Sequence, residues 1–470
     1  MDVIPLVLSG GGGSRLWPLS SPSIPKQFIR LDNRPSLYEQ SLARVSHLNE
    51  LLPVKNSVIV SSVDNEYQIK SQSKSLDKNI KKKFIFETEK EDTLRAIYRG
   101  LISEDDDAIF IVLPSDHLIN TSEVFTKTLI RGVNLVKKSG GIVLIGVEPS
   151  HPSEKYGYIQ TNKKINSKSM IADVLKFHEK PNKNQAKKYL QSESIFFWNS
   201  GVAIFKKNEI LKKISQIYSY NNSRNYKEFS KNYNNDVLQL LPKISFDVGI
   251  LEKADNIKII PYKGHWSDLG SWSTVTDLFN SDDDGNNYYG DYISYDSKGN
   301  IIVNDTINPI SIFGVKDHLI LNYQNRMLVA PIKKLDDIKS FTDYLNNDDK
   351  LKEVINGDIN VRPWGNFHNL FETDKFKLKK ITVDPKQTLS LQYHNHRYES
   401  WFVISGKGVV ELNGENIKVS KNQSIYITKG AKHRVTNPSK ATQLIFVEIQ
   451  AGKILSELDI VRLEDNYNRT

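Results

Sequence analysis

Close to its amino terminus the chain carries a glycine-rich loop with two basic residues behind it. Residues 4–8 form a short apolar run typical of a buried strand, and Gly10 to Gly13, Ser14, Arg15 and, further on, Lys26 follow. Glycine lets backbone N–H groups turn inward onto a ligand, because no Cβ blocks the approach and a positive φ costs little. The loop is therefore suited to hold phosphate. A Walker A motif and a dinucleotide fingerprint both fail to fit, because the required Gly-Lys-Ser/Thr and the last glycine of G-x-G-x-x-G are missing.

Two aspartates further along could bind a metal ion. Asp116 stands just beyond an apolar run at residues 108–113, and Asp268 lies in the block from His265 to Trp272. Mg²⁺ on nucleotide phosphates usually needs only one or two carboxylates, with water completing its shell. Each aspartate also has a simpler interpretation, since Asp116 could cap a helix and Asp268 could lie in a capped turn between core tryptophans.

The elements that would position these residues alternate between two patterns. Apolar runs at 57–61, 108–113 and 141–146 predict strands, and amphipathic stretches at 36–48 and 125–138 predict helices. This βαβα order, which continues to about residue 279, predicts an α/β domain at 1–280 with a mostly parallel sheet covered on both faces. Ligands in such folds bind beyond the carboxyl ends of the strands.

The remainder of the chain is rich in short strands. Residues 281–350 predict a β-rich linker that ends in a helix at 335–345, and residues 351–470 predict a jelly-roll barrel. Within the barrel, Gln392 and His394 are two residues apart and share one face of a strand. Glu399 follows at the start of the next strand, and His433 comes much later, at the end of another strand.

The glycine-rich stretch resembles the signature of sugar-1-phosphate nucleotidylyltransferases, G-G-x-G-x-R-L-x-P followed by P-K. The segments Trp17 and Gln27-Phe28 resemble the mannose-1-phosphate guanylyltransferase branch. Further blocks follow in that family's order: Leu113 to His117, Tyr156 to Ile159, Glu179 to Pro181, Trp198 to Gly201 and Trp266 to Trp272. The resemblance implies a Rossmann-like fold for the first domain.

The same resemblance implies a role for individual residues. Nucleotide and phosphate would contact Gly10, Gly11, Gly12, Gly13, Ser14, Glu87 and Thr93, with Arg15, Lys26 and Lys180 acting in catalysis. The sugar would be bound by Gly157, Glu179, Asn199 and Asp247, and one Mg²⁺ by Asp116 and Asp268. The expected substrates are GTP and mannose 1-phosphate, which would give GDP-mannose and diphosphate.

The barrel resembles the cupin domain of type II phosphomannose isomerases. The matching strings include Arg362 to Gly365, Leu389 to Gln392 and Asp459 to Arg462. The resemblance implies Gln392, His394, Glu399 and His433 as ligands of a divalent metal such as Zn²⁺ or Co²⁺, with Arg397 holding the phosphate of a hexose 6-phosphate. His396 is a reserve ligand, because simple alternation would point it inward. A cupin interior that holds no metal is the alternative.

Two departures from these families leave the specificity open. Where the guanylyltransferases carry R-N-T-A-P-A-I, the segment Glu91 to Ile97 keeps only Thr93, Ala96 and Ile97. Ser400 stands where the isomerases carry a histidine, and a serine hydroxyl is a poor general base for isomerisation at neutral pH. The alternatives are a nucleotidylyltransferase for another base or hexose, and a cupin that only binds sugar or mediates assembly.

Composition limits the remaining possibilities. The 470 residues carry a formal charge of +9 without one basic stripe, which disfavours nucleic acid, and they include no cysteine for disulfides or thiolate metal sites. The absence of a signal-peptide pattern or a membrane-length apolar run leads us to expect a cytoplasmic protein without a membrane partner. We also expect a homo-oligomer.

Overall fold

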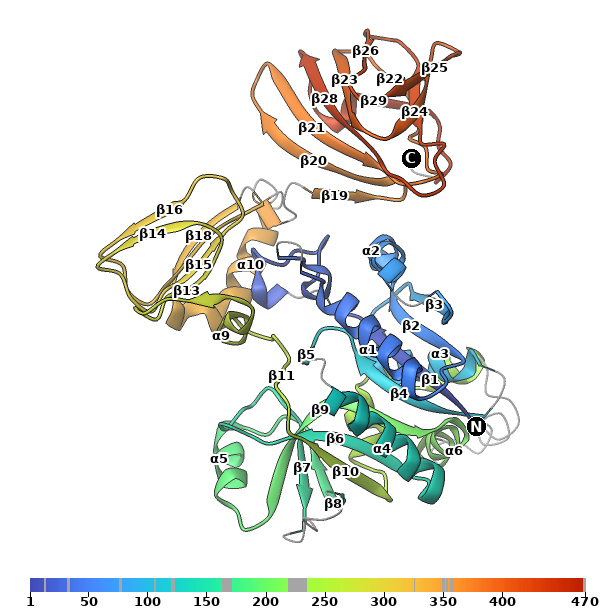
Figure 1. Cartoon of the computed structure of the whole chain (residues 1–470), viewed down its shortest axis with the longest axis vertical. Helices are drawn as coiled ribbons and strands as arrows, with labels where there is room; N and C mark the ends of the chain where they lie inside the picture. Colours follow the sequence, from blue (N-terminus) through green and yellow to red (C-terminus); the bar gives the residue numbers. More distant parts are fainter. Residues whose placement is uncertain are drawn as a thin grey trace. The chain divides into compact units, whose positions relative to one another are not determined.

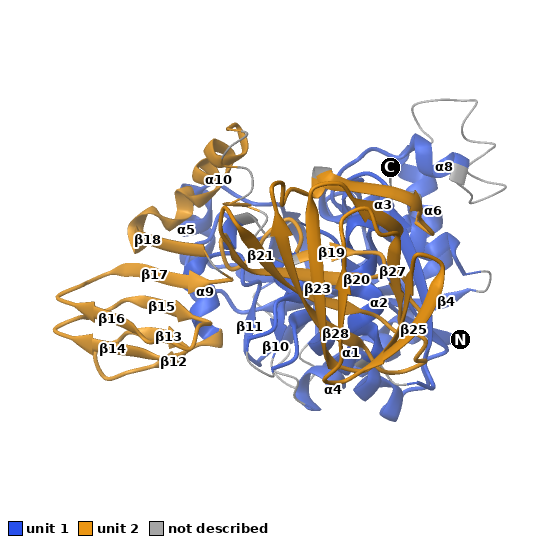
Figure 2. Cartoon of the chain, turned by 90° about the horizontal axis from the view of Figure 1, so that it is seen from above, with its two compact units in different colours: residues 1–16, 24–277 blue, residues 17–23, 278–470 orange. Residues whose placement is uncertain are grey.

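The structure is a computed structural model (Figure 1). It describes residues 1–11, 14–31, 34–75, 78–104, 107–119, 123–162, 171–218, 235–324, 326–348, 351, 354–355 and 359–467. The chain divides into two compact units, Met1–Leu16 with Ile24–Asp277 and Trp17–Ser23 with Leu278–Thr470 (Figure 2). The helices in these described ranges include none that is long and apolar enough to cross a membrane. The domain boundaries expected at 280 and 350 remain predictions.

The first unit is built on a nine-stranded sheet in the order β3-β2-β1-β4-β9-β6-β10-β8-β7. Its strands are β1 (Asp2–Ser9), β2 (Asn56–Ser62), β3 (Lys81–Glu87), β4 (Ala108–Pro114), β6 (Ile142–Val147), β7 (Tyr158–Thr161), β8 (Ala172–His178), β9 (Ile195–Lys206) and β10 (Ile257–Tyr262). Neighbours from β3 to β4 are parallel, as are β6 and β10, whereas β8 and β9 run against the strands beside them. The mostly parallel α/β sheet predicted from the sequence is thus confirmed.

Helices cover both faces of this sheet (Figure 1). They include α1 (Leu37–Leu51), α2 (Glu66–Gln72), α3 (Asp92–Ile102), α4 (Glu123–Ser139), α5 (Lys183–Gln191), α6 (Lys207–Tyr218) and α8 (Asn235–Leu240). The short helix α9 (Trp272–Val275) follows near the end of this unit. Because side chains alternate along β1, Val7 packs with α1 and α4 on one face and Leu6 packs with α3 and α6 on the other. A strand buried on both faces needs the continuous apolar run that the sequence shows.

The carboxyl ends of β1 and β4 lie together at one edge of the sheet. The Ser115 amide donates a hydrogen bond of 3.0 Å to the carbonyl of Leu8, so the segment after β4 lies beside the end of β1. Beyond this edge, β5 (Leu118–Ile119) pairs with β11 (Trp266–Ser267). These pairings bring the glycine-rich loop, Asp116 and Asp268 into one region of the first unit.

The second unit begins with stacked β-coils. The strands are β12 (Asn280–Ser281), β13 (Asn287–Tyr289), β14 (Tyr292–Tyr295), β15 (Ile301–Asn304), β16 (Ile310–Phe313), β17 (His318–Tyr323) and β18 (Arg326–Pro331), followed by α10 (Ile338–Asn346). β13, β15 and β17 are parallel neighbours, and β14 and β16 form a second parallel pair. Asn300 Nδ2 donates to Asn286 Oδ1 at 2.9 Å, which ties one coil to the next. The left-handed sense expected for this region remains a prediction.

The carboxyl-terminal barrel consists of two antiparallel sheets. Its strands are β19 (Ile359–Arg362), β20 (Gly365–Glu372), β21 (Phe376–Val383), β22 (Leu391–His394), β23 (Arg397–Ser405), β24 (Lys407–Leu412), β25 (Glu415–Ser420), β26 (Ser424–Ile427), β27 (His433–Thr436), β28 (Leu444–Gly452) and β29 (Ile460–Glu464). The sheet orders are β19-β20-β21-β28-β23-β26 and β25-β24-β27-β22-β29, and Trp401, Val410 and Phe446 pack between the sheets. This arrangement confirms the predicted jelly roll.

One short segment of the glycine-rich signature belongs to the second unit. Trp17 is 3 % exposed and packs with Ile338, Leu345 and Ile355, and its ring lies 5.7 Å from that of Phe341. Residues 17–23 therefore help to form the core around α10. The flanking residues on both sides belong to the first unit.

We predict that Trp17→Ala destabilises the protein by about 3–5 kcal/mol, because truncation of a buried aromatic residue leaves a cavity. Equilibrium unfolding in urea would measure the loss. Tyr295→Ala is the control, since Tyr295 is 72 % exposed and its loss should cost less than about 1 kcal/mol. Equal unfolding midpoints for Trp17→Ala and the wild type would contradict this packing.

Candidate functional site

The glycine-rich loop leaves β1 and turns at its second glycine. Gly11 has φ of +92°, a value that favours glycine, and Gln27 Nε2 donates to the carbonyls of Gly10 and Gly11 at 3.3 and 3.5 Å. Arg15 is exposed to solvent. Gly12, Gly13 and the side chain of Ser14 lie outside the described residues. The part of the loop that is described is therefore open, as access for a phosphate requires.

Lys26 connects the two aspartates expected to hold Mg²⁺. Its Nζ lies 3.0 Å from Asp116 Oδ2 and donates a hydrogen bond of 2.6 Å to the backbone carbonyl of Asp268. Tyr156 donates to Asp268 Oδ1 at 3.0 Å, which orients that carboxylate. Burial raises the pKa of Asp116, but the charges of Lys26 and His117 outweigh it and hold the pKa below its usual range. Asp116 is thus ionised near neutral pH.

This arrangement fits a Mg²⁺ ion. Asp116 and Asp268 come from different segments, after β4 and after β11, and Lys26 contacts the carboxylate of Asp116 and the backbone carbonyl of Asp268. Mg²⁺ retains several waters and takes only one or two protein carboxylates when it binds phosphate. The residues that could hold it are Asp116 and Asp268.

A second polar group lies near Trp198 and contains all the residues expected to bind sugar. Asn199 Nδ2 donates to Asp247 Oδ1 at 2.7 Å, and its backbone amide donates to the carbonyl of Gly157 at 2.8 Å. Lys180 Nζ lies 2.9 Å from Glu179 Oε1. At Gly157 a Cβ would lie 2.7 Å from Phe177 and 3.1 Å from Glu179, so the glycine allows this close approach. The structure therefore brings these residues together.

Aromatic rings join the two polar groups. The ring of Tyr156 lies 4.7 Å from that of Trp198 and 5.3 Å from that of Trp266, and its hydroxyl reaches Asp268. Sequence analysis assigned Tyr156 no role of its own, although it opens the Tyr-Gly-Tyr-Ile block. Only the folded chain shows that this tyrosine contacts an aspartate more than one hundred residues away.

The segment that departs from the family forms a buried charge cluster. Glu91 and Arg95 are each 6 % exposed; their Oε1 and Nη1 atoms are 3.3 Å apart, and Arg99 Nη2 lies 2.7 Å from Glu91 Oε2. Arg95 also donates to the carbonyl of Leu241, directly after α8. Burial and the charge of Glu91 raise the pKa of Glu87 to about 7, although Arg99 opposes the shift. The two unusual residues, Glu91 and Arg95, thus neutralise each other.

Thr93 has a structural partner in this region. Its Oγ1 accepts a hydrogen bond of 2.8 Å from the amide of Phe246, the residue before Asp247. Thr93 therefore links α3 to the segment that carries Asp247. The nucleotide contacts expected for Glu87 and Thr93 remain predictions.

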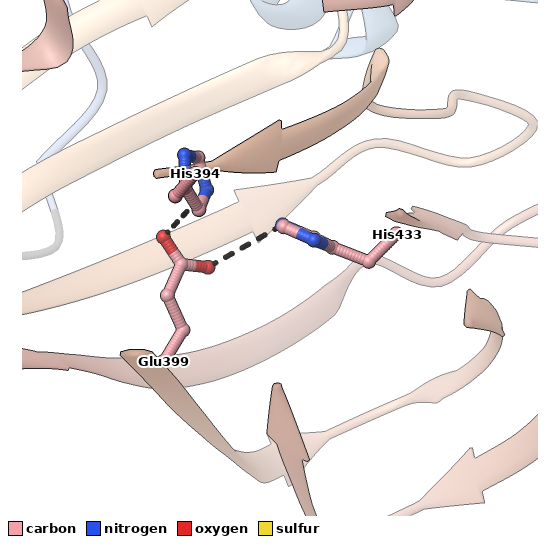
Figure 3. A group of neighbouring side chains, drawn as sticks. All are labelled: His394, Glu399 and His433. Carbon is pink, nitrogen blue, oxygen red and sulfur yellow. Dashed lines mark ion pairs between the residues drawn. The ribbon is translucent and has the colours of Figure 1, made fainter. Parts of the chain in front are cut away.

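In the barrel, His394, Glu399 and His433 converge in the buried interior (Figure 3). His394 Nε2 lies 3.0 Å from Glu399 Oε1, and His433 Nε2 lies 3.6 Å from Glu399 Oε2. Gln392 faces His433 across the β22–β27 ladder, which places it beside the group. His394, His433 and Arg397 outweigh burial and hold the pKa of Glu399 well below its usual range.

The hydrogen bonds of the two imidazoles show that this group fits a metal ion. His394 Nδ1 lies 3.3 Å from the carbonyl of Asp459 and His433 Nδ1 lies 2.9 Å from that of Ala431. A carbonyl only accepts, so each Nδ1 carries a proton, and the Nε2 atoms of both rings face the Glu399 carboxylate. His433 Nε2 is buried without a hydrogen bond. A metal-ligating histidine usually donates its other ring N–H to a backbone carbonyl in this way.

Three expectations for the barrel need revision. His396 does not point inward: the strand β22 ends at His394, and the His396 ring is 48 % exposed and pairs with Asp459 at 2.8 Å. Ser400 alternates with the buried Glu399 and Trp401 and therefore faces away from the interior. The histidine that Ser400 replaces would likewise face outward, so its loss says nothing about a base in the pocket.

Arg397 is fully engaged with its neighbours. It is 1 % exposed; its Nε donates to Glu399 Oε1 at 3.0 Å and its Nη1 donates to the carbonyl of Ser456 at 3.0 Å. Its Nη2 lies 3.4 Å from His394 Nε2. These contacts orient Glu399 and differ from the free phosphate contact expected for Arg397.

Further polar residues line the same interior and were not found from the sequence. The pocket is lined in part by Lys379, Glu448, Gln450 and Arg462. Gln450 Nε2 donates to Glu399 and to Glu448, and burial together with the charge of Glu399 raises the pKa of Glu448 to about 8. Arg462 Nε is buried without a hydrogen-bond partner. Alternation along β28 could have revealed Glu448 and Gln450, which share the face of the core residue Phe446.

Comparisons with known proteins agree with this geometry. A family model for nucleotidyl transferases matches residues 4–285, and one for the mannose-6-phosphate isomerase C-terminal region matches residues 347–465. A mannose-1-phosphate guanylyltransferase of Salmonella montevideo is 30% identical over 99% of this chain and 100% of its own length. The chain belongs to the mannose-1-phosphate guanylyltransferase family with a C-terminal isomerase domain. It is therefore an enzyme of the nucleotidyltransferase type.

One further relative by sequence and one solved structure are also similar to this chain. The alginate biosynthesis protein AlgA of Pseudomonas aeruginosa is 30% identical over all of this chain and 98% of its own length. The crystal structure of mannose-1-phosphate geranyltransferase from Thermus thermophilus matches with a TM-score of 0.62 at 24% identity, covering 74% of this chain and 100% of that chain. That likeness concerns the fold.

We predict that Asp247 makes the protein less stable as the pH rises. Burial and the nearby Glu179 raise the pKa of Asp247 from 3.8 to about 7. Between these values the folded state binds the proton more tightly than the unfolded state, so stability falls as pH increases through this window. Asp247→Asn should remove this loss and gain roughly 2 kcal/mol on the wild type between pH 5 and pH 8.

Urea unfolding of both proteins across this pH range would measure the difference. Asp64→Asn, at an exposed position, is the control and should show no such gain. A constant difference between Asp247→Asn and the wild type at all pH values would show that Asp247 titrates normally.

Proposed function

We propose that the first unit transfers a guanylyl group from GTP to mannose 1-phosphate, giving GDP-mannose and diphosphate. The observation that carries the proposal is the position of Lys26 beside both Asp116 and Asp268, next to the glycine-rich loop. This arrangement concentrates positive charge and metal ligands where a triphosphate would lie. The full-length relatives named mannose-1-phosphate guanylyltransferase support the choice of nucleotide and sugar.

In this mechanism the protein aligns its substrates and compensates their charge. Amides of the loop, Arg15 and Lys26 would bind the triphosphate and stabilise the departing diphosphate. Lys180 would direct the phosphate oxygen of mannose 1-phosphate toward the α-phosphorus, while Glu179 and Asn199 bind hydroxyls of the hexose. Mg²⁺ held by Asp116 and Asp268 would supply neutralisation of phosphate charge when bound.

For the barrel we propose isomerisation of fructose 6-phosphate to mannose 6-phosphate. The buried group of His394, Glu399 and His433 supports a divalent metal such as Zn²⁺ or Co²⁺, with Gln392 as a further ligand. Arg462 is better placed than Arg397 to bind the phosphate, because its Nε has no partner whereas Arg397 is held by Glu399 and Ser456. The metal would polarise the sugar carbonyl when bound.

A second candidate for the first unit is transfer of a different nucleotide. The observation in its favour is the buried Glu91–Arg95 pair, which occupies positions where the guanylyltransferase branch carries arginine and proline. A cupin that only binds sugar has lost its main support, because Ser400 faces outward.

The product also has a proposed use. AlgA is named for alginate biosynthesis and a relative from Xanthomonas campestris is named for xanthan biosynthesis. We therefore propose that the nucleotide sugar made here serves the synthesis of a polysaccharide. We further propose that the enzyme acts in the cytoplasm.

We predict diphosphate release with mannose 1-phosphate, Mg²⁺ and GTP, and much less with ATP, CTP, UTP or dTTP. Asp116→Asn and Lys26→Met should each lower the rate by about 10²–10³-fold, because each removes a group that stabilises transferring charge. Asp64→Asn serves as the matched control and should retain the wild-type rate. Release with another nucleotide would favour the second candidate, and no release with any nucleotide would refute transfer.

For the barrel we predict conversion of fructose 6-phosphate by the full chain, measured by a coupled assay together with metal content. His433→Gln should lose both metal and activity. Arg462→Leu should keep the metal but raise KM at least about 10-fold, since a charge-assisted phosphate contact is worth about 1.5–3 kcal/mol. Ser400→Ala should behave as the wild type. Loss of isomerisation in Ser400→Ala, or an inactive but metal-loaded wild type, would contradict the proposal.

A further inference from the structure

The outer face of the six-stranded sheet in the barrel is apolar. Along β23, Arg397, Glu399 and Trp401 point inward, and the alternate residues Tyr398 and Phe402 point outward. The exposed apolar side chains on this face are Phe371 55 %, Phe376 38 %, Tyr398 38 %, Phe402 43 %, Ile404 42 %, Tyr426 60 % and Ile449 44 %. We call these seven residues the apolar sheet face.

The strand register makes the apolar sheet face continuous. One row across the sheet runs from Phe371 through Leu378, Ile449 and Ser400 to Tyr426, each paired with the next on the neighbouring strand. The rings of Tyr398 and Tyr426 stack with their centroids 6.1 Å apart. On the β20–β21 side of the same face, the ring centroids of Phe371 and Phe376 lie 5.7 Å apart. These side chains thus form one surface.

The second sheet of the same barrel presents a different outer surface. There Arg434 lies 2.7 Å from Glu411 and 2.9 Å from Glu464, and both pairs are partly solvated. An antiparallel sheet normally keeps one such polar face toward water. The contrast within one barrel indicates that the apolar sheet face is covered in the working protein.

We propose that the apolar sheet face is covered by the same face of a second copy of this chain. With about 200 Å² for a fully exposed large side chain, the seven residues present about 600 Å², the upper end of the largest apolar patch on a typical monomer. Half-buried neighbours such as Leu378 and Val447 add to this area, which then approaches the roughly 800 Å² per partner of a stable interface. Homodimer contacts are also the most apolar class of protein interface.

The arrangement suits a twofold contact between two sheets. A self-complementary patch pairs with itself about a twofold axis, and stacked sheets approach to about 10 Å. The small Ser400 lies in the middle of the central row, between Ile449 and Tyr426. Lys429 lies 4.7 Å from the Tyr398 ring centroid and adds a positive charge beside the apolar residues. Lys380, which is paired with His368 and Val447, places one positive charge within the same sheet face.

The first test is the mass of the full chain in solution. Light scattering coupled to size exclusion should give twice the 53.7 kDa of one chain. Ile449→Lys should yield a monomer, because two facing ammonium groups would be buried without partners. Leu463→Lys is the matched control: Leu463 is also 44 % exposed but follows the pocket residue Arg462 on β29 of the other sheet, and this variant should stay dimeric.

Circular dichroism would establish that Ile449→Lys is folded, and Phe402→Lys provides an independent variant if it is not. A monomeric wild type would overturn the proposal. So would a dimer that survives both Ile449→Lys and Phe402→Lys.

The second test uses the absence of cysteine from the chain. In Ser400→Cys the introduced thiol is unique, so the dimer should protect it from maleimide, whereas the thiol of Leu463→Cys should react freely. If the thiol at position 400 were protected from maleimide while light scattering showed a monomer, another part of the same chain would cover the face and the proposal would fail. Free labelling at the rate of Leu463→Cys would show that the face is open and would also overturn it.

Discussion

Side chains on a β strand alternate between its two faces, and this constraint distributes the chemistry of the carboxyl-terminal barrel. On β23 it sends Arg397, Glu399 and Trp401 inward and Tyr398, Ser400 and Phe402 outward. On β28 it adds Glu448 and Gln450 to the interior. The inward set orients a carboxylate between two imidazoles, and the outward set makes an apolar surface. A shift of one residue in either strand would exchange the two sets completely.

In the first unit the corresponding constraint is the shared edge of parallel strands. β1 and β4 end side by side, so a loop near residue 10 and an aspartate at 116 meet although a hundred residues separate them. Lys26 then holds Asp116 and the backbone of Asp268 within reach of one ammonium group. Without a cation there, the partly buried Asp116 would lose the charge that keeps its pKa low. Phosphate chemistry and structural stability therefore draw on the same lysine.

Much of this organisation was predictable from the sequence, for identifiable reasons. Apolar runs such as 108–113 and 57–61 became central strands because burial on both faces demands an uninterrupted apolar stretch. His394, Glu399 and His433 could be selected because metal ligands are few in kind. Tyr156, Arg462 and the Glu91–Arg95 pair could not be placed, since their contacts depend on pairings across the folded sheet. His396 was misplaced because alternation holds only inside a strand, and β22 ends at His394. The replacement at Ser400 was interpreted without the alternation along β23, which turns this side chain outward.

The position of Trp17 bears on how such a two-part enzyme could arise and be divided. Residues 17–23 form part of the second unit, while the residues before and after them belong to the first. A gene cut near residue 277 would therefore separate α10 from the tryptophan that fills its core, and would leave an apolar ring in the released fragment exposed to water. The chain crosses between its units more than once. A gene fusion or fission at a single point could not have joined or separated the two units without changing the packing of Trp17 on α10. Substitutions in residues 17–23 and in α10 are therefore expected to have accumulated together.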